Sequence, residues 1–222
     1  MKFCPRCGNF VNHKYAICPK CNFDSRKIPR KNIKNIPGSK SNYHLRPTTD
    51  ISKLELKIHD LTNIERQKLN LSLLSYDAEI RNIARGHSED MSVRNFFAHE
   101  TPDGKSPTDR ALSANFALDN RSWFKKLNLQ VERNDIRINT TEQWQFGENI
   151  YQTNLYDSIY LINNIPTHYY WRDLETIAKK TVDGWMNSKE HRENIVLPLW
   201  KKEGIGVYIS DDDKVFITQN FN

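Results

Sequence analysis

The four cysteines of this 222-residue chain form two C-x-x-C pairs. Cys4 and Cys7 make the first pair, Cys18 and Cys21 the second, and ten residues separate them. Two such knuckles can present four thiolates in a tetrahedron, which is the geometry that structural Zn²⁺ requires. Two disulfides are the alternative, but C-x-x-C pairs in an intracellular protein favour a metal. A closed Cys₄ site leaves no coordination position open, so the predicted zinc is structural and supplies the folding energy of its short segment.

Three residues far apart in the sequence are candidates for a catalytic or binding site rather than a structural one: His99, Glu148 and His191. His99 follows two aromatic residues and precedes a turn at residues 102–104, so we expect it at the edge of an anchored segment. Glu148 follows Gly147 in a short apolar stretch that suits a buried strand. A confined carboxylate needs a hydrogen bond, a cation or a metal as its partner. These residues are therefore candidates for a shared site.

The segment that contains His191, residues 182–195, reads VDGWMNSKEHRENI. It places Trp185, Ser188 and His191 at intervals of three residues, which predicts that they share one side of a helix or helical turn. His87 differs from the other candidates because it lies within an apolar stripe. We predict that His87 is a hydrogen-bonded packing residue.

The elements that must position these residues follow from periodicity and turn residues. A first helix is expected from about residue 51, and a second near Asp77, a good N-cap, with an apolar stripe from Ile80 to Met91. Ser106 and Pro107 predict the start of a short helix. A further amphipathic helix covers residues 174–185, and the chain ends in a predicted hairpin of residues 204–210 and 214–221. Two aromatic segments lack a clear period: 116–145, predicted as a hairpin or an irregular excursion, and 156–171.

The charge of the chain is unevenly distributed. Residues 1–49 carry eleven Lys and Arg against Asp24 alone, a net charge of +10, whereas the rest carries 22 basic and 26 acidic residues, a net charge of −4. Residues 25–50 are basic, contain Pro and Gly, and show no apolar periodicity, which predicts a flexible basic linker. The predicted domains are thus a zinc ribbon at 1–24, this linker at 25–50 and a main domain at 51–222. The ribbon and linker suit a protein, nucleic-acid or anionic membrane partner, and a solvated tether is the interpretation that we favour for the linker.

The sequence has no run of eighteen apolar residues, so no transmembrane helix is expected. Its first ten residues lack the apolar region of a secretory signal peptide. Residues 22–222 contain no cysteine, which excludes thiol catalysis there and suits a reducing compartment. The sequence therefore predicts a cytoplasmic protein.

Six short motifs occur in register along the chain: FFAH, SPTDR, FGENI, GWMNSKEHRENI, GIGV and TQNF. In this order they resemble the CAP superfamily, which includes cysteine-rich secretory proteins, antigen 5 and plant pathogenesis-related proteins. The resemblance is to the microbial SCP-like branch and covers residues 55–222. It implies an α+β fold, an α-β-α sandwich with a small, mainly antiparallel sheet between helical layers.

The resemblance also implies a cleft that holds two histidines and two acidic residues, whose histidines bind Zn²⁺ or another divalent ion in some members. His99, Glu148 and His191 match three of these positions, so they are the predicted catalytic residues, with His99 and His191 as ligands of a second divalent ion. Ser188 stands at the fourth position, where animal and plant members have an acid, and this departure weakens a metal site. Neighbouring motif residues are predicted to contact a ligand: Ser188, Asn149, Trp185 and Arg110.

Three functions are compatible with these residues. The first is a binding module whose cleft holds a lipid, peptide or glycan, with apolar walls from the aromatic segments. The second is a metal-assisted, peptidase-like hydrolase in which Glu148 activates a water molecule. The third is a scaffold whose zinc ribbon binds a protein or a nucleic acid. We favour the binding module.

Overall fold

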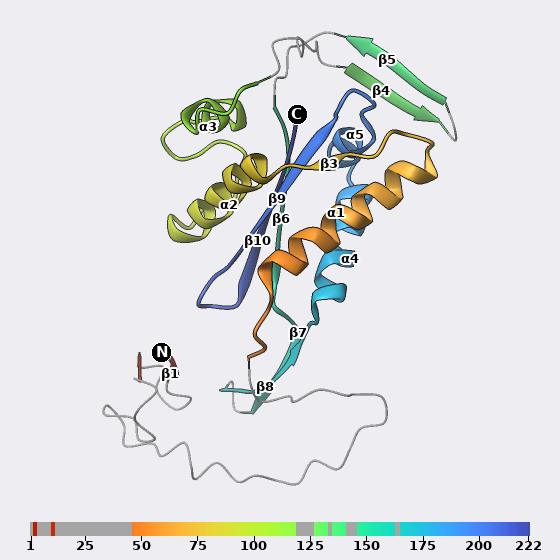
Figure 1. The fold of residues 1–222 in the computed structure, drawn as a ribbon. Coiled ribbons are helices and arrows are strands. Elements are labelled where there is room, and N and C mark those ends of the chain that lie inside the picture. Colours follow the sequence, from red (N-terminus) through yellow and green to blue (C-terminus); the bar gives the residue numbers. More distant parts are fainter. Residues whose placement is uncertain are drawn as a thin grey trace. The chain divides into compact units, whose positions relative to one another are not determined.

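The computed structural model describes residues 46–118, 146–162 and 165–222, with residues 162 and 165–167 described by their backbone alone. It also describes the backbone of four strands at 2–3, 10–11, 127–132 and 135–140. The chain divides into two compact units, one of Thr48–Leu155 with Arg172–Asn222 and one of Met1–Pro47 with Tyr156–Trp171 (Figure 1). The four cysteines and residues 25–45 of the predicted linker lie outside the described residues.

The larger unit is built around a four-stranded sheet with the order β3-β9-β10-β6. Strand β10 pairs antiparallel with both β9 and β6, and only the short β3 is parallel to its neighbour. The predicted C-terminal hairpin is confirmed, since β9 and β10 are consecutive and joined by a tight turn in which Asp213 has a φ of 66°. Among the strands that the structure describes, β6 pairs with β10 alone. The bounds of the strands are β3 Ser75–Tyr76, β6 Gly147–Asn154, β9 Lys202–Ile209 and β10 Lys214–Phe221.

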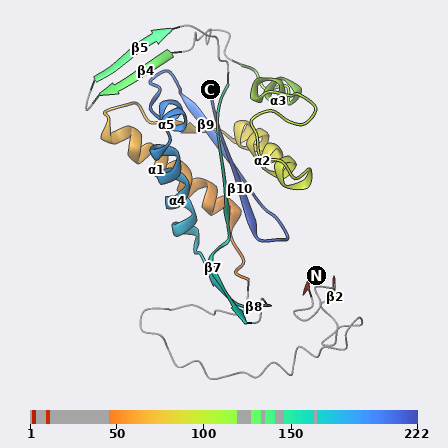
Figure 2. The ribbon, with the colours of Figure 1, turned by 180° about the vertical axis from the view of Figure 1, so that it is seen from behind.

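Helices lie on both faces of this sheet, as expected for an α-β-α sandwich (Figures 1 and 2). The first face carries α1 Ile51–Lys68, α4 Leu174–Asn187 and α5 Lys189–Val196, and the second carries α2 Ala78–Val93 with α3 Pro107–Ser113. Helix α2 approaches β9 very closely because Gly204 and Gly206 have no side chain. A Cβ atom added at these glycines would lie 2.1 Å from the backbone N of Arg81 and 2.0 Å from that of Arg85. The GIGV motif therefore fixes α2 against the sheet.

The helix starts follow the predicted caps. The Asp77 side chain accepts from the backbone N–H groups of Glu79 and Ile80 at the start of α2. Ser106 and Asp109 form a capping box at the start of α3, with Pro107 as the first helical residue. The predicted stripe of α2 is buried throughout, from Ile80 to Met91 with His87 among its members.

The structure differs from the sequence predictions at three points. The segment 182–195 is not one helix: α4 ends at Asn187, Ser188 is extended with a φ of −95° and a ψ of 129°, and α5 begins at Lys189. Of the two aromatics that precede His99, only Phe96 packs against the core, and Phe97 is exposed. Helix α1 buries Glu55, Thr62 and Arg66 besides Leu54 and Ile58, whereas Leu56 and Ile64 are exposed. Periodicity read from apolar residues alone misses such polar burial.

The remaining strands form hairpins. In the second unit β7 Tyr156–Ile162 pairs antiparallel with β8 Ile165–Trp171, and β1 Lys2–Phe3 pairs with β2 Phe10–Val11. Strand β4 Leu127–Glu132 pairs with β5 Asp135–Thr140, so the hairpin expected within 116–145 is present in the backbone. Among the described residues, no helix is both long and apolar enough to cross a membrane.

Candidate functional site

Glu148 is the centre of a hydrogen-bonded cluster on strand β6. Its side chain is 2% exposed. Glu148 pairs with Asn220 of β10, which in turn pairs with Gly204 of β9. Residues paired across strands point to the same face of a sheet, and Gly204 faces α2, so the side chain of Glu148 also points towards α2. Oε2 of Glu148 accepts from the Arg110 guanidinium and from Nδ2 of Asn220 at 3.0 Å. Oε1 lies 3.0 Å from Nδ1 of His99. Both carboxylate oxygens are therefore engaged within the protein.

Arg110 ties the segment that contains His99 to this carboxylate. Its side chain reaches Glu148 from helix α3 and is 10% exposed. Its Nη1 donates to the carbonyl oxygen of His99 at 2.8 Å and to that of Lys105 at 3.1 Å. One guanidinium thus holds the turn after His99 and neutralises the buried carboxylate. The capping box of α3 fixes the helix that carries it.

His87 lies behind this pair on α2 and is fully enclosed. Its Nε2 lies 3.0 Å from the carbonyl oxygen of Ala98 and 3.8 Å from Oε1 of Glu148. Burial lowers the pKa of His87, and the positive charge of Arg110 lowers it further against the opposing effect of Glu148. His87 is therefore neutral at pH 7. Its position agrees with its predicted role as a hydrogen-bonded packing residue.

The pKa of Glu148 results from opposing effects. Burial by itself raises it, but the hydrogen bond from His99 and the charge of Arg110 outweigh burial and bring it below its ordinary value. Glu148 is therefore ionised at pH 7. An ionised, enclosed and fully hydrogen-bonded carboxylate is a poor acceptor of a proton from water.

His191 lies on helix α5, which packs on the face of the sheet opposite to α2 and α3, and its side chain is half-buried. Burial lowers its pKa and the charge of nearby His99 lowers it further, so the two imidazoles lie within electrostatic range of each other. Two asparagines hold α5 in this position. Asn149 donates to the carbonyl oxygen of His191 at 3.1 Å, and Asn194 donates to the carbonyl oxygen of Glu148 at 3.0 Å and to Oδ1 of Asn149 at 2.9 Å.

The structure therefore brings His99, Glu148, His191 and Arg110 together at strand β6. Asn149 is completely buried and acts between β6, β10 and α5, because it also donates to Oε1 of Gln219 at 3.0 Å. Trp185 is completely buried, and its indole donates to the carbonyl oxygen of Ile150 at 3.1 Å. Ser188 lies in the break between α4 and α5 and is half-buried. Asn149 and Trp185 hold the elements of the site in place, and ligand contact by them stays a prediction.

Sequence reasoning missed Asn220 and Asn194 as members of this cluster. Asn220 lies in the TQNF motif and Asn194 in the HRENI part of the GWMNSKEHRENI motif. The sequence around an asparagine does not indicate which residue its side chain will bind. Only the register of β10 against β6 places Asn220 opposite Glu148.

Both oxygens of Glu148 already have partners within the protein, namely Arg110, Asn220 and His99. A divalent ion bound by His99 and His191 stays a prediction. Within residues 46–118, 146–162 and 165–222, no group of three or more His, Cys, Asp or Glu side chains is arranged to hold a metal ion. The site offers two imidazoles, one of which is oriented by a carboxylate behind it.

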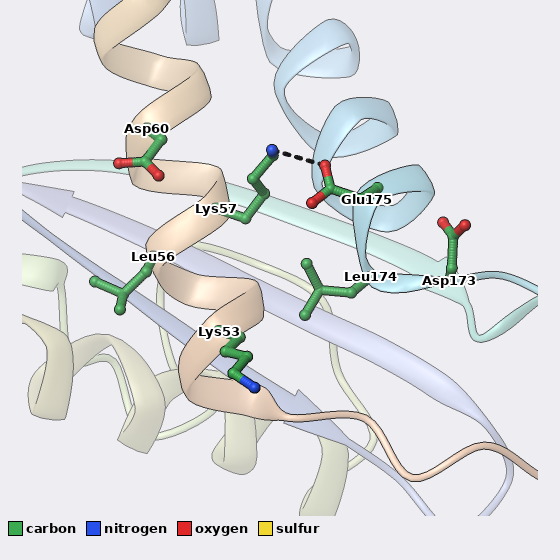
Figure 3. Close-up of a pocket in the computed structure, with 7 residues that line it drawn as sticks. All are labelled: Lys53, Leu56, Lys57, Asp60, Asp173, Leu174 and Glu175. Carbon is green, nitrogen blue, oxygen red and sulfur yellow. Dashed lines mark ion pairs between the residues drawn. The ribbon is translucent and has the colours of Figure 1, made fainter.

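A hollow of about 400 Å³ lies elsewhere in the larger unit, between the first half of α1 and the start of α4 (Figure 3). The ion pair of Lys57 and Glu175, 2.7 Å apart, joins the two helices there. None of the predicted site residues lines it, so this hollow is distinct from the candidate site. Its lining consists of Lys53, Leu56, Lys57, Asp60, Asp173, Leu174 and Glu175.

The sequence of this chain is similar to that of a known protein family and of individual relatives. The sequence profile of the cysteine-rich secretory protein family, CAP, matches residues 59–221. The uncharacterized protein YkwD of Bacillus subtilis is 27% identical over 169 residues, which are 76% of this chain and 48% of that protein. This chain thus spans about half the length of that relative.

Two solved structures are similar to the main domain. An extracellular protein containing a SCP domain, from Bacillus anthracis, is 27% identical with a TM-score of 0.50, over 79% of this chain and 44% of that chain. An outer surface protein from Borrelia burgdorferi is 16% identical with a TM-score of 0.51, over 80% of this chain and 97% of that chain. At 16% identity the second similarity concerns the fold alone.

Proposed function

Because the chain belongs to the cysteine-rich secretory protein family, CAP, we propose that its main domain is a binding module in which His99 and His191 contact the polar part of a lipid, peptide or glycan. One observation carries the proposal. Glu148 is enclosed by internal partners, whereas the side chain of His99 is 51% exposed and that of His191 is half-buried. Nε2 of His99 and both ring nitrogens of His191 form no hydrogen bond with a residue that the structure describes.

The protonation of these groups indicates what they recognise. His191 is neutral at pH 7 because its pKa is lowered, and a neutral imidazole offers one donor and one acceptor. Nδ1 of His99 lies against Glu148, which leaves Nε2 as the nitrogen of that ring that can contact a ligand. Imidazole nitrogens that can contact a ligand suit the hydroxyl or amide groups of a glycan, a peptide or a lipid headgroup.

Native mass spectrometry of the full chain against panels of phospholipids, short peptides and oligosaccharides tests this proposal. One panel should show saturable binding that weakens at least about tenfold, or about 1.4 kcal/mol, in the His99→Ala plus His191→Ala variant. Glu100→Ala is the matched control, because Glu100 is exposed beside His99. Binding that is equal in both variants, or no binding in any panel, contradicts the proposal.

Hydrolysis is the second candidate, and the contact between His99 and Glu148 is the observation that favours it. A carboxylate that orients one ring nitrogen leaves the other as a general base, so His99 rather than Glu148 would accept the proton of water. Turnover of a peptide library should then fall in Glu148→Gln and vanish in His99→Ala. Turnover that persists in His99→Ala excludes this role.

For the N-terminal segment we propose the structural Cys₄ zinc site of Cys4, Cys7, Cys18 and Cys21. The spacing of the cysteines supports it, and so does the backbone pairing of β1 with β2, since the first C-x-x-C lies between these strands in the sequence. Elemental analysis of the full chain should find one zinc per chain, lost in Cys4→Ser plus Cys18→Ser. An unchanged zinc content in that variant contradicts the site.

A further inference from the structure

Gln219 interrupts an apolar row on strand β10. The other residues of the strand on the same face, Val215, Ile217 and Phe221, are apolar and completely buried, and Gln219 is completely buried with them. A buried amide costs stability unless it is hydrogen-bonded, whereas an apolar side chain of the same length has no such requirement. The amide at this position therefore calls for a reason besides packing.

Both ends of the Gln219 amide have partners. Its Nε2 donates to Oε2 of Glu203 at 2.6 Å and to the hydroxyl oxygen of Thr62 at 3.2 Å. Its Oε1 accepts from Nδ2 of Asn149 at 3.0 Å. The register explains this arrangement, because Gln219 pairs with Asn149 of β6 on one side and with Ile205 of β9 on the other, and Glu203 precedes Ile205 on the same face of β9. Buried polar side chains thus form a row from Glu203 through Gln219 to Asn149.

The hydrogen bonds of this row all run in one direction. A carboxylate accepts through its oxygens, so the amide nitrogen of Gln219 has to face Glu203 and its amide oxygen has to face Asn149. Asn149 then presents its Nδ2, which also donates to the backbone carbonyl oxygen of His191 at 3.1 Å. The row that begins at Glu203 therefore ends at the backbone of a residue of the candidate site.

Helix α5, which carries that residue, is held differently at its two ends. At its C-terminal end the completely buried Arg66 donates from Nη1 to the carbonyl oxygens of Ile195 and Leu197, at 2.7 and 2.9 Å. At its N-terminal end the N-cap residue Ser188 forms no side-chain capping hydrogen bond with the described residues. The first turn of α5 therefore depends on contacts with the sheet, such as the hydrogen bond from Asn149.

We propose that Gln219 is a positioning residue for His191. Its amide holds Asn149, and Asn149 holds the carbonyl oxygen of His191 and with it the first turn of α5. Gln219 itself lies in the core and touches no ligand. The inference rests on the proposed binding function, because a ring that contacts a ligand has to be held at a fixed position by residues behind it. Glu203, besides joining α1 to the sheet, sets the orientation of the Gln219 amide.

Nuclear magnetic resonance of the full chain without a ligand tests the proposal. Gln219→Met keeps the length of the side chain but removes the amide, so that Asn149 loses one partner. The ¹³C signal of the His191 carbonyl group should then move upfield, because its hydrogen bond weakens, and the ring signals of His191 should shift with it. Gln219→Asn, whose amide is too short to reach both neighbours, gives the same test if Gln219→Met does not fold.

An exchange of the two side chains is the rescue. In Glu203→Gln plus Gln219→Glu, the amide at position 203 can donate to the carboxylate at position 219, and that carboxylate can still accept from Asn149. The row is thereby kept although both residues are changed. The carbonyl and ring signals of His191 should lie closer to their wild-type positions in this variant than in Gln219→Met.

Glu55→Gln is the matched control. The side chain of Glu55 is 1% exposed, pairs with Arg85 at 2.6 Å and accepts from the backbone N–H of Val207 at 3.1 Å, outside the row. Its substitution also weakens a buried polar contact between a helix and the sheet. This variant should lose stability in denaturant unfolding but leave the signals of His191 in place.

Three results would overturn the proposal. The first is an unchanged His191 carbonyl signal when the Gln219 amide is removed. The second is a displacement in the exchange variant as large as in Gln219→Met. The third is an equal displacement in Glu55→Gln, because the change would then reflect a general loosening of the fold. Since these measurements need no ligand, their failure is distinct from a failure of the binding panels. Circular dichroism confirms that each variant is folded.

Discussion

Two buried glutamates on opposite faces of one sheet illustrate how similar chemistry serves different purposes. Glu148 of β6 faces α2, and Glu203 of β9 faces α1. Each has a histidine at hydrogen-bonding distance: His99 at 3.0 Å from Glu148 and His59 at 2.6 Å from Glu203. The carboxylates are alike in burial, so the difference between the two sites lies in their histidines.

His59 uses both ring nitrogens inside the protein. Its Nδ1 contacts Glu203 and its Nε2 lies 3.3 Å from Nδ2 of Asn63 on the same helix, and its side chain is 13% exposed. Gln219 satisfies the second oxygen of Glu203 at 2.6 Å. This cluster has nothing left to offer a ligand, and its role is to join α1 to β9 and β10.

His99, by contrast, uses one ring nitrogen and leaves the other outside, with half of its side chain exposed. The charge of Glu148 is balanced by a separate group, Arg110, so that His99 need not be protonated to hold the carboxylate. The His99–Glu148 site thus differs from the His59–Glu203 pair in two respects. Arg110 balances the charge of its carboxylate, and one ring nitrogen of its histidine remains able to bind a ligand. Variants on both faces test this distinction.

Removal of Arg110 should have the largest effect. Arg110→Ala leaves Glu148 buried without its permanent positive partner, and loss of one member of a buried ion pair costs about 3 kcal/mol or more. Denaturant unfolding measures the change. In the double variant Arg110→Met plus Glu148→Met, which removes both charges, part of the loss should be recovered. A loss below about 1 kcal/mol in Arg110→Ala would show that Glu148 does not depend on this charge.

His59→Ala should have the next largest effect. It leaves the buried Glu203 with Gln219 alone and deprives Asn63 of a partner, which costs about 2 kcal/mol of unfolding free energy. Asp60→Ala, at the exposed neighbouring position on α1, is the control and should stay within about 0.5 kcal/mol of wild type. Equal effects of the two variants would mean that the Glu203 cluster is not structural.

The two clusters also differ in how far the sequence predicts them. His99, Glu148 and His191 lie in motifs with turn, strand and helix indications of their own, and their family resemblance relates them to one cleft. The elements that carry them were also predictable, because Asp77, Ser106 with Pro107, and the alternation of residues 204–221 are local patterns. Local chemistry decides where such elements begin and end.

No local sequence pattern predicts the cluster of Glu203 and its partners. His59 lies on a helix whose apolar periodicity is weak, and Glu203 precedes the GIGV motif without a turn or a cap. Their contact depends on a separation of 144 residues and on the packing of α1 against β9. The sequence also did not predict the break at Ser188. The residues on either side of it, Trp185 and Asn194, bind carbonyl groups of β6 that are 35 and 46 residues away in the sequence.

Acid should destabilise the fold through His87, His191 and Glu148. The lowered pKa values of His87 and His191 mean that the unfolded chain binds more protons than the folded one below the ordinary value of about 6.5. The free energy of unfolding should therefore fall as the pH drops from about 6.5, by up to about 1.4 kcal/mol per pH unit for each group. Glu148, whose pKa is also lowered, adds a further loss below about 4.5.

The variant His87→Gln isolates one contribution to this pH dependence. Protonation of His87 places a proton on Nδ1, which is buried without a hydrogen-bond partner among the described residues, whereas glutamine does not titrate. Urea unfolding at several pH values should give a shallower slope for His87→Gln between pH 6.5 and 5. Identical slopes would mean that His87 is not the group that resists protonation.

The smallest change in stability is expected for His99→Ala, and it is the most informative. Because His99 is half exposed, water can replace its hydrogen bond to Glu148, and the free energy of unfolding should stay within about 0.5 kcal/mol of wild type. His59→Ala removes the same kind of contact at a larger cost. If the two histidines proved equally costly to remove, His99 would be a structural residue like His59. If His99→Ala keeps the free energy of unfolding but loses ligand binding, the ring of His99 serves binding rather than the stability of the fold.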